Sequence, residues 1–272
     1  MAASRSKRQH FSKEIRKFCN SYSFDGVDSR WHSWLRLPSS RILTTEKVDW
    51  EHPTTPEIGR NYLNLLHDLR QALPAPQFLL TSALPVGEWV LQNIDLRAAA
   101  HHLDLLNLMG YDFTGSWTDL SGHHAQLHPP PGDPSHTHPT LRSSCAAGIR
   151  YATSHGFPSG KILLGIPVYA RYFPGARGPG HPFSGSEEMN YCDLEDGWVR
   201  QSHVNEAVCA ASWVDHGAGG KGFVSFDAVQ TVRMKAAYAR SLGLGGLVYW
   251  HGAGDRRDEL SLVAAGYHQL RC

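Results

Sequence analysis

Residues 103–112 read LDLLNLMGYD, an apolar run that ends in a tyrosine and an aspartate. Apolar residues occupy both parities of this run, which is typical of a strand in a parallel sheet covered on both faces. Other strands are predicted at residues 24–28, 48–51, 77–84, 161–168 and 246–250. Polar side chains follow several of these runs, and the carboxyl ends of the strands are where a barrel carries its site.

Helical segments separate the predicted strands. Thr55 and Pro56 form an N-cap followed by proline at the first helical position, and apolar residues then recur at helical spacing as far as Leu73. Further helices are predicted at residues 11–23, 87–102, 141–154 and 227–242. This alternation indicates a (β/α) barrel or a doubly wound α/β sheet, and 272 residues suit one domain of that kind.

Charge and composition exclude several classes of partner. The chain has 26 basic and 25 acidic residues, a net charge of +1, which gives no electrostatic footprint for nucleic acid or an anionic membrane. No apolar run is long enough for a transmembrane helix. Residues 1–10 are polar and basic and do not resemble a signal peptide, so the compartment stays open.

The histidines and cysteines do not predict a metal centre. Five histidines lie at residues 123–138, in a loop rich in proline and glycine, without an HExxH motif. The five cysteines are scattered and form no CxxC pair. The glycine-rich residues 217–222 lack the phosphate-loop pattern and are interpreted as a turn. We therefore expect neither a metal nor another cofactor.

Three segments taken together resemble the family-18 glycoside hydrolases, the fungal-type chitinases with a small insertion. Residues 107–117 (NLMGYDFTGSW), 161–171 (KILLGIPVYAR) and 245–250 (GGLVYW) are similar to that family's sixth, seventh and eighth barrel strands. Residues 122–127 and 224–227 fall between them in the family's order. The resemblance implies a (β/α)8 TIM-type barrel truncated at its N-terminus, with about strands four to eight present. Residues 1–272 would then form a single partial catalytic domain.

The family's fourth-strand motif, DxxDxDxE, is present in two halves. Residues 25–28 (DGVD) supply the first half and residues 49–51 (DWE) the second, with an insert at residues 29–47 between them. Without that insert, Asp28, Asp49 and Glu51 would stand at i, i+2 and i+4, on one face of one strand.

The resemblance assigns a catalytic role to five residues. Glu51 would protonate the leaving oxygen of a glycosidic bond, and Asp49 would orient the substrate's own N-acetyl group, which replaces the usual second carboxylate in this family. Asp28 would tune the charge of the pair. Tyr111 and Asp112 would hydrogen-bond the N-acetyl group at the cleavage subsite.

Aromatic and polar residues would complete a substrate cleft. By resemblance, Trp250 is the apolar floor beneath the sugar, and Trp117 is a further platform. Met109, Tyr169 and Arg171 would line the cleft. Taken one at a time, these residues also fit plain structural roles, because a tryptophan or methionine at a strand end often only fills a core.

The chain departs from the family pattern in three ways. The family's first three strands are missing, which would leave two open parallel edges, and the insert interrupts the catalytic motif. The segment at residues 172–221, between the seventh and eighth strands, is short. By resemblance it lacks the large α+β insertion of some relatives, which would leave a shallower cleft and favour endo-acting cleavage.

The predicted function is hydrolysis of β-1,4-N-acetylglucosamine linkages in chitin or chitooligosaccharides by a substrate-assisted, retaining mechanism. The alternatives are a chitinase-like sugar-binding protein and an inactive fragment of a chitinase. A complete barrel would be monomeric, with no nucleic-acid or membrane partner. Members of the family are often extracellular, although this chain shows no export signal.

The insert generates a first prediction. Residues 29–47 have neither strand alternation nor a helical pattern, and we interpret them as a translated, unspliced intron. We expect the mature transcript to lack the codons for these residues and to begin upstream of Met1. Sequencing the transcript checks both points, and a mature message that retains the codons would contradict the interpretation.

Overall fold

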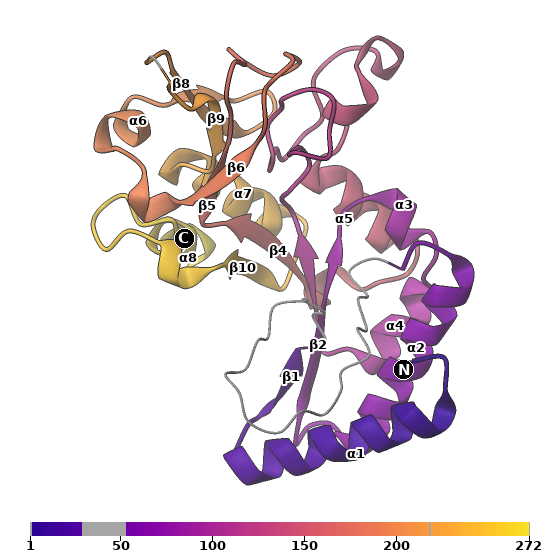
Figure 1. Cartoon of the computed structure of the whole chain (residues 1–272). Coiled ribbons are helices and arrows are strands. Elements are labelled where there is room, and N and C mark those ends of the chain that lie inside the picture. Colours follow the sequence, from indigo (N-terminus) through magenta and orange to yellow (C-terminus); the bar gives the residue numbers. More distant parts are fainter. Residues whose placement is uncertain (1, 29–52, 218, 272) are drawn as a thin grey trace.

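Five parallel strands form the main sheet of the protein. The computed structural model describes residues 2–28, 53–217 and 219–271. Within them the sheet has the order β1-β2-β3-β4-β10, and every neighbouring pair is parallel. The strands are β1 (Gly26–Asp28), β2 (Leu79–Pro85), β3 (Leu105–Met109), β4 (Ile162–Pro167) and β10 (Gly246–Trp250). The sheet is curled, so the predicted truncated α/β barrel is confirmed (Figure 1).

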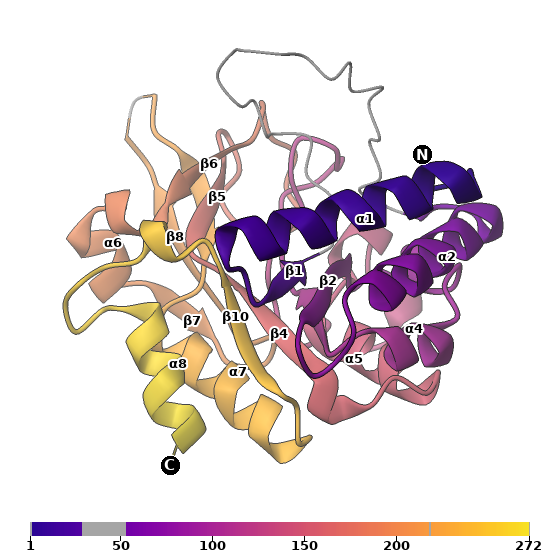
Figure 2. The same ribbon diagram turned by 90° about the horizontal axis from the view of Figure 1, so that it is seen from below.

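Helices cover the outer side of this sheet (Figure 2). They are α1 (Arg5–Tyr22), α2 (Pro56–Ala72), α3 (Glu88–Leu91), α4 (Leu96–His102), α5 (Cys145–Ser154), α7 (Val229–Ser241) and α8 (Leu262–Arg271). The predicted cap is confirmed, because the Thr55 hydroxyl accepts a hydrogen bond from the backbone N–H of Ile58 at 3.3 Å. The helix predicted at residues 87–102 is instead two helices, α3 and α4. Asp95 explains the break, because its side chain caps α4.

The core lies between the sheet and the helices. Leu80 of β2, Leu106 and Leu108 of β3, and Leu164 of β4 are fully buried and belong to one apolar cluster. The alternate residues Thr81 and Asn107 point away from that core, since their side chains meet Asp28. The inner face of the curled sheet is therefore where polar side chains gather.

A second, antiparallel sheet lies between β4 and β10 in the chain. Its order is β6-β5-β9-β8-β7. The strands are β5 (Tyr169–Phe173), β6 (Glu187–Asn190), β7 (His203–Asn205), β8 (Ala210–Asp215) and β9 (Gly222–Phe226), and the segment also holds α6 (Asp196–Arg200). The segment at residues 172–221, predicted to be short and to lack the large α+β insertion of some relatives, thus belongs to a small α+β unit of this sheet and α6. The shallower cleft and endo-acting cleavage stay predictions.

The second sheet was missed because its strands carry weak signals. β6 reads EEMN and β7 reads HVN, so neither contains an apolar run. Their pairing is set by long-range antiparallel register, in which Tyr169 lies opposite Asn190 and Ser212 opposite His203. Local sequence does not encode such pairings.

A buried ion pair connects helix α7 to the segment that follows β3. Lys235 is fully buried, and its Nζ donates to Oδ2 of Asp227 and to the carbonyl of Ala125, both at 2.6 Å. Thr231 donates its hydroxyl to the other oxygen of Asp227 at 2.7 Å. Burial acts against the charged lysine, but Asp227 outweighs it and holds the pKa of Lys235 above its ordinary value. The pair therefore fixes residues 122–127 against α7.

Removal of this lysine charge should destabilise the whole domain. We expect Lys235→Met to lower the free energy of unfolding by about 3–5 kcal/mol, because Asp227 is left buried without its cation. Urea denaturation followed by circular dichroism measures this. Arg200→Met, which removes an exposed ion pair to Glu259, is the matched control and should have little effect. Equal changes in the free energy of unfolding for the two variants would contradict the large contribution proposed for the buried ion pair.

Candidate active site

Asp112 lies at the centre of the polar side chains beyond the carboxyl end of β3. Its backbone has a φ of 62°, in the left-handed region that aspartate tolerates better than most residues. This conformation turns the chain sharply after Tyr111. The Asp112 side chain is 40% exposed, whereas its neighbours Tyr169 and Arg171 are buried. A carboxylate that remains partly accessible among buried donors is suited to meet a ligand.

Every polar contact that the described residues make with the Asp112 carboxylate goes to the same oxygen, Oδ1. Oδ1 accepts the hydroxyl of Tyr169 at 2.8 Å and a guanidinium N–H of Arg171 at 2.7 Å. Nδ1 of His124 lies 3.9 Å from the same oxygen. Among the described residues no donor is within hydrogen-bond range of Oδ2. One oxygen is thus an anchor and the other is available.

Opposing effects set the charge state of Asp112. Burial acts to raise the pKa of its carboxyl, but His124 and the Arg171 guanidinium outweigh burial and hold that pKa below its usual range. The distance of 3.9 Å is too long for a hydrogen bond, so a neutral His124 ring contributes through the dipole of its N–H group. Asp112 is therefore ionised at neutral pH and acts as an acceptor.

Arg171 joins this carboxylate to an exposed aromatic ring. Its guanidinium lies 4.8 Å from the ring centroid of Trp117, a cation–π contact, and Trp117 is 59% exposed. A second carboxylate, from Glu188 of β6, lies 3.3 Å from Arg171. Tyr169 and Arg171 follow strand β4, which ends at Pro167, and they lie within the next strand, β5. They enter the site from the second sheet.

Tyr111 and Met109 form the apolar side of this group. Tyr111 is buried and packs edge-on against Tyr169, with ring centroids 6.1 Å apart. Met109 packs against the same small cluster, together with Ala125. The structure therefore brings together Met109, Tyr111, Asp112, Trp117, Tyr169 and Arg171, six of the ten residues predicted from the sequence.

Trp250 and Asp28 lie at the ends of two other parallel strands. Trp250 ends β10 and is 40% exposed, and its carbonyl accepts the backbone N–H of Val168 at 2.7 Å. The peptide bond that follows it is cis. Asp28 ends β1, and its Oδ2 accepts Nδ2 of Asn107 at 2.7 Å and the hydroxyl of Thr81 at 2.5 Å.

The remaining two predicted residues, Asp49 and Glu51, lie outside the described residues. The sequence reasoning missed four side chains around these groups: Thr81 and Asn107 on Asp28, His124 near Asp112, and Glu188 on Arg171. Asn107 and Thr81 were readable as polar residues inside apolar strand runs. His124 and Glu188 carried no such signal, because their partners are distant in the chain.

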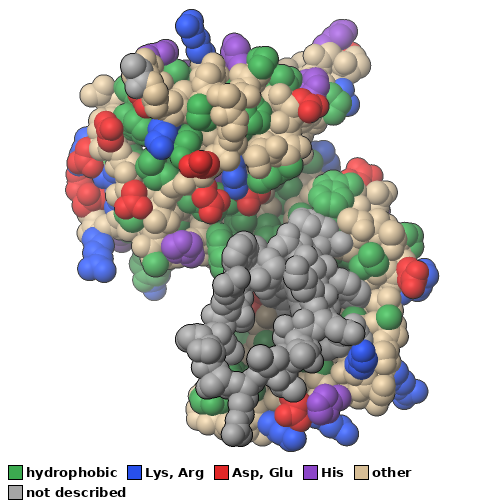
Figure 3. Space-filling view, viewed as in Figure 1, with side chains coloured by type: hydrophobic (Ala, Val, Ile, Leu, Met, Phe, Trp, Pro, Cys, Tyr) green, Lys and Arg blue, Asp and Glu red, His purple; other side chains and the backbone are tan. Residues whose placement is uncertain are grey.

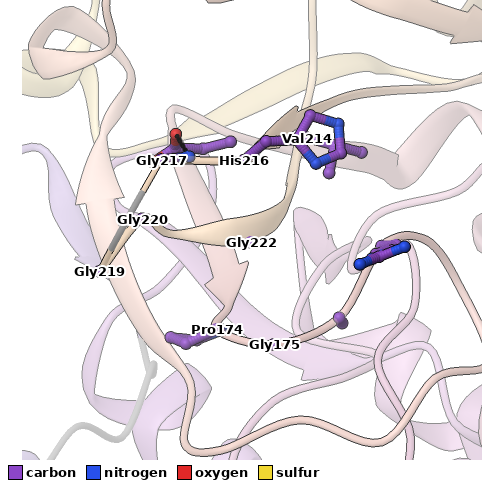
Figure 4. Close-up of a pocket in the computed structure, with 11 residues that line it drawn as sticks. Pro174, Gly175, Val214, His216, Gly217, Gly219, Gly220 and Gly222 are labelled. Atoms are coloured by element: carbon purple, nitrogen blue, oxygen red, sulfur yellow. Dashed lines mark hydrogen bonds between the residues drawn. The ribbon is translucent and has the colours of Figure 1, made fainter.

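A shallow pocket lies elsewhere, at the tips of the second sheet (Figure 4). It has a volume of about 370 Å³ and lies between the turn after β5 and the β8–β9 hairpin. Its lining is largely glycine backbone with Arg177, Asp215 and His216, and it includes none of the predicted site residues. In the space-filling view, acidic side chains gather over α6 and β6, on the same lobe (Figure 3). The pocket is separate from the group around Asp112, whereas Glu188 of β6 reaches that group through Arg171.

Comparison with known proteins gives the family. Residues 1–255 match the family described as glycosyl hydrolases family 18. The chain belongs to this family. It is 29% identical to Chitinase A1 of Niallia circulans, across 96% of this chain and 39% of that protein. It is 27% identical to Endochitinase 1 of Metarhizium robertsii, across 99% of this chain and 61% of that protein.

Solved structures of family-18 proteins and their relatives share the fold. A mutant class V chitinase from Nicotiana tobaccum, in complex with NAG4, has a TM-score of 0.79 and 25% identity, over 100% of this chain and 76% of that one. A chitinase-like agglutinin from Robinia pseudoacacia has a TM-score of 0.76 and 22% identity, over 99% and 74%. The family-18 fold thus occurs in chitinases and in an agglutinin.

Among the described residues, no group of three or more histidine, cysteine, aspartate or glutamate side chains is arranged to hold a metal ion. Nor does that part of the chain contain a helix of the length and apolarity needed to cross a membrane.

His123 makes stability depend on pH. Burial lowers its pKa to about 4, helped by the nearby His124. The unfolded chain binds a proton near pH 6.5, so folding is opposed as the pH falls from about 6.5 towards 4. We expect this residue to remove up to about 1.4 kcal/mol of stability per pH unit below pH 6.

Urea denaturation at pH 7, 6 and 5 measures this dependence. The variant His123→Phe should show a shallower decline than the natural chain. The exposed His136→Gln is the control and should decline like the natural chain. A His123→Phe variant with an unchanged decline would show that His123 does not titrate in this window.

Proposed function

We propose that the protein hydrolyses β-1,4-linked N-acetylglucosamine oligomers. The observation that carries the proposal is Asp112, an ionised carboxylate held through one oxygen, whose other oxygen faces no donor among the described residues. Family membership and the likeness to a chitinase in complex with NAG4 support this class of substrate. The chain spans 39% and 61% of the length of the two chitinases named above, so the activity of those proteins comes to it only as a proposal.

The visible residues suit recognition of an N-acetyl sugar. The second oxygen of Asp112 would accept the acetamido N–H, with the Tyr111 hydroxyl beside it. Trp250 and Trp117 are both substantially exposed, and an indole ring suits the C–H face of a pyranose. Met109, Tyr169 and Arg171 would line the cleft between them. Water would leave this pocket when a sugar enters, which strengthens the polar contacts.

In the proposed reaction Glu51 is the general acid. It would donate its proton to the leaving glycosidic oxygen while the acetamido oxygen of the sugar attacks the anomeric carbon. Asp49 would hold the acetamido group in the attacking geometry and stabilise its developing positive charge. Water would then open the cyclic intermediate and transfer a proton back to Glu51. Two inversions give a product with retained configuration.

Asp28 would act on these two residues and not on the substrate. Its carboxylate is held by Thr81 of the neighbouring strand β2 and by Asn107 of the next strand, β3. A fixed negative charge disfavours ionisation of a nearby carboxyl group. It would therefore help to keep a proton on the Asp49–Glu51 pair, as a general acid requires.

The test of the proposal is hydrolysis of chitotetraose by the full chain, followed by chromatography and by NMR of the product anomer. We expect shorter oligomers with the β anomer formed first. Glu51→Gln should lower the rate about 100- to 10,000-fold, the usual contribution of a general acid. A fully deacetylated tetrasaccharide should not be cleaved, because it lacks the attacking oxygen.

Other outcomes would assign the chain differently. Binding of chitotetraose with no cleavage by the natural chain would favour the sugar-binding alternative. Neither binding nor cleavage would identify an inactive fragment. A variant without residues 29–47, tested in parallel, shows whether the insert interferes. Product lengths from longer oligomers distinguish endo from exo attack.

A further inference from the structure

His124 is buried in a way that calls for a partner. Its side chain is fully inaccessible, and neither ring nitrogen has a hydrogen-bond partner among the described residues. Buried polar atoms in folded proteins are nearly always paired, because an unpaired group loses its hydration without compensation. We therefore expect a nearby polar group to compensate for the hydration that the two ring nitrogens lose on burial.

The group nearest to the ring is the Asp112 carboxylate. Nδ1 of His124 lies 3.9 Å from Oδ1, and the imidazole packs against Tyr169 with ring centroids 5.3 Å apart. His124 thus approaches the anchored oxygen of Asp112, the one that also accepts Tyr169 and Arg171. Its Nδ1 is the third polar group directed at that atom.

The backbone of His124 is held on both sides. Its N–H donates to the hydroxyl of Ser225 at 3.2 Å, and its carbonyl accepts the N–H of Phe113 at 3.1 Å. The next residue, Ala125, accepts Nζ of Lys235. Because Phe113 directly follows Asp112, the two residues are connected through the backbone as well as across space. The backbone position of His124 is therefore coupled to that of the loop that carries Asp112.

The charges around His124 favour its neutral form. Burial lowers its pKa, and Arg171 of β5 acts in the same direction. Asp112, after β3, and Asp227, after β9, oppose this without overcoming it. Nearby, Tyr169 is protonated, His123 is itself buried, and the cation of Lys235 is paired with Asp227. A neutral imidazole has a single N–H, and the side facing a carboxylate is the one that gains from carrying it.

We infer that His124 is a positioning residue for Asp112: neutral, with its proton on Nδ1, it turns an N–H dipole toward Oδ1 beside the two hydrogen bonds from Tyr169 and Arg171, and leaves Oδ2 for the ligand. The effect of His124 on Asp112 is a property of the protein without ligand. Only its use in binding a substrate rests on the proposed function. His124 does not touch substrate. It acts by holding the orientation and charge of the carboxylate that does.

Nuclear magnetic resonance of the isotopically labelled full chain tests this directly. In the natural protein, the ring nitrogen shifts of His124 should report a neutral imidazole protonated at Nδ1 at pH 7. The Asp112 carboxyl carbon should titrate below the ordinary aspartate range. A His124 ring protonated at Nε2 instead would overturn the inference, and this measurement needs no variant.

Two substitutions and a control complete the test. His124→Leu removes the donor and should raise the titration midpoint of Asp112 by about half a pH unit or more. His124→Asn retains a donor on a short side chain and should restore much of the difference, which a purely space-filling role would not. His136→Leu, on the surface, should leave Asp112 unchanged. An Asp112 midpoint that is the same in the Leu variant and the natural chain would overturn the inference.

Failure of the two proposals can be told apart. If the chain never cleaves chitotetraose but Asp112 responds to His124→Leu, the proposed function fails and the positioning role stands. If cleavage occurs and Asp112 does not respond, the reverse holds.

Discussion

The parallel pairing of β4 with β10 is the constraint on which the site depends. The two strands run in register from Leu163 opposite Gly246 to Pro167 opposite Trp250. Parallel neighbours cannot be joined by a tight turn, so all of the chain between them must leave the sheet and return. The chain between β4 and β10 forms the second sheet and α7. Its first strand, β5, carries Tyr169 and Arg171 to the edge where Trp250 ends.

Two carboxylates at this edge are held in the same manner. Asp28 is fixed by donors from β2 and β3, and Asp112 by donors from β5. In both cases the partners come from elements far away in the chain, so neither carboxylate depends on its own loop for orientation. Preorganised groups of this kind act without reorganising when a ligand arrives. The fold thus sets the geometry of these groups without a ligand.

Much of this arrangement follows from the sequence, and the remainder has physical reasons for being missed. The parallel strands were predictable, because runs such as residues 105–109 are apolar on both parities. Tyr111, Asp112 and Trp250 were found because they end such runs and match family motifs. The short polar strands β6 and β7 were not, since they are stabilised by pairing and not by their own composition.

The residues that contact Asp28 and Asp112 were harder to predict from the sequence than these two carboxylates themselves. Thr81 and Asn107 stand out only as polar residues on apolar strands, and His124 was considered solely as one of several histidines in a loop. Its closeness to Asp112 depends on Ser225, about a hundred residues away along the chain. Spacing within a motif cannot reveal such a contact. Asp49 and Glu51 remain as the sequence and the family resemblance assign them.

The buried lysine of α7 has a consequence for how this domain can evolve or be recombined. Lys235 divides its charge between Asp227, eight residues earlier, and the carbonyl of Ala125, a residue that packs with Tyr111 and Tyr169. Helix α7 and the loop at residues 122–127 therefore depend on each other for stability. A chimera that exchanges the loop between two family members while keeping the helix would inherit a cation without its acceptor geometry. Grafts of substrate specificity onto this scaffold would have to carry both pieces together.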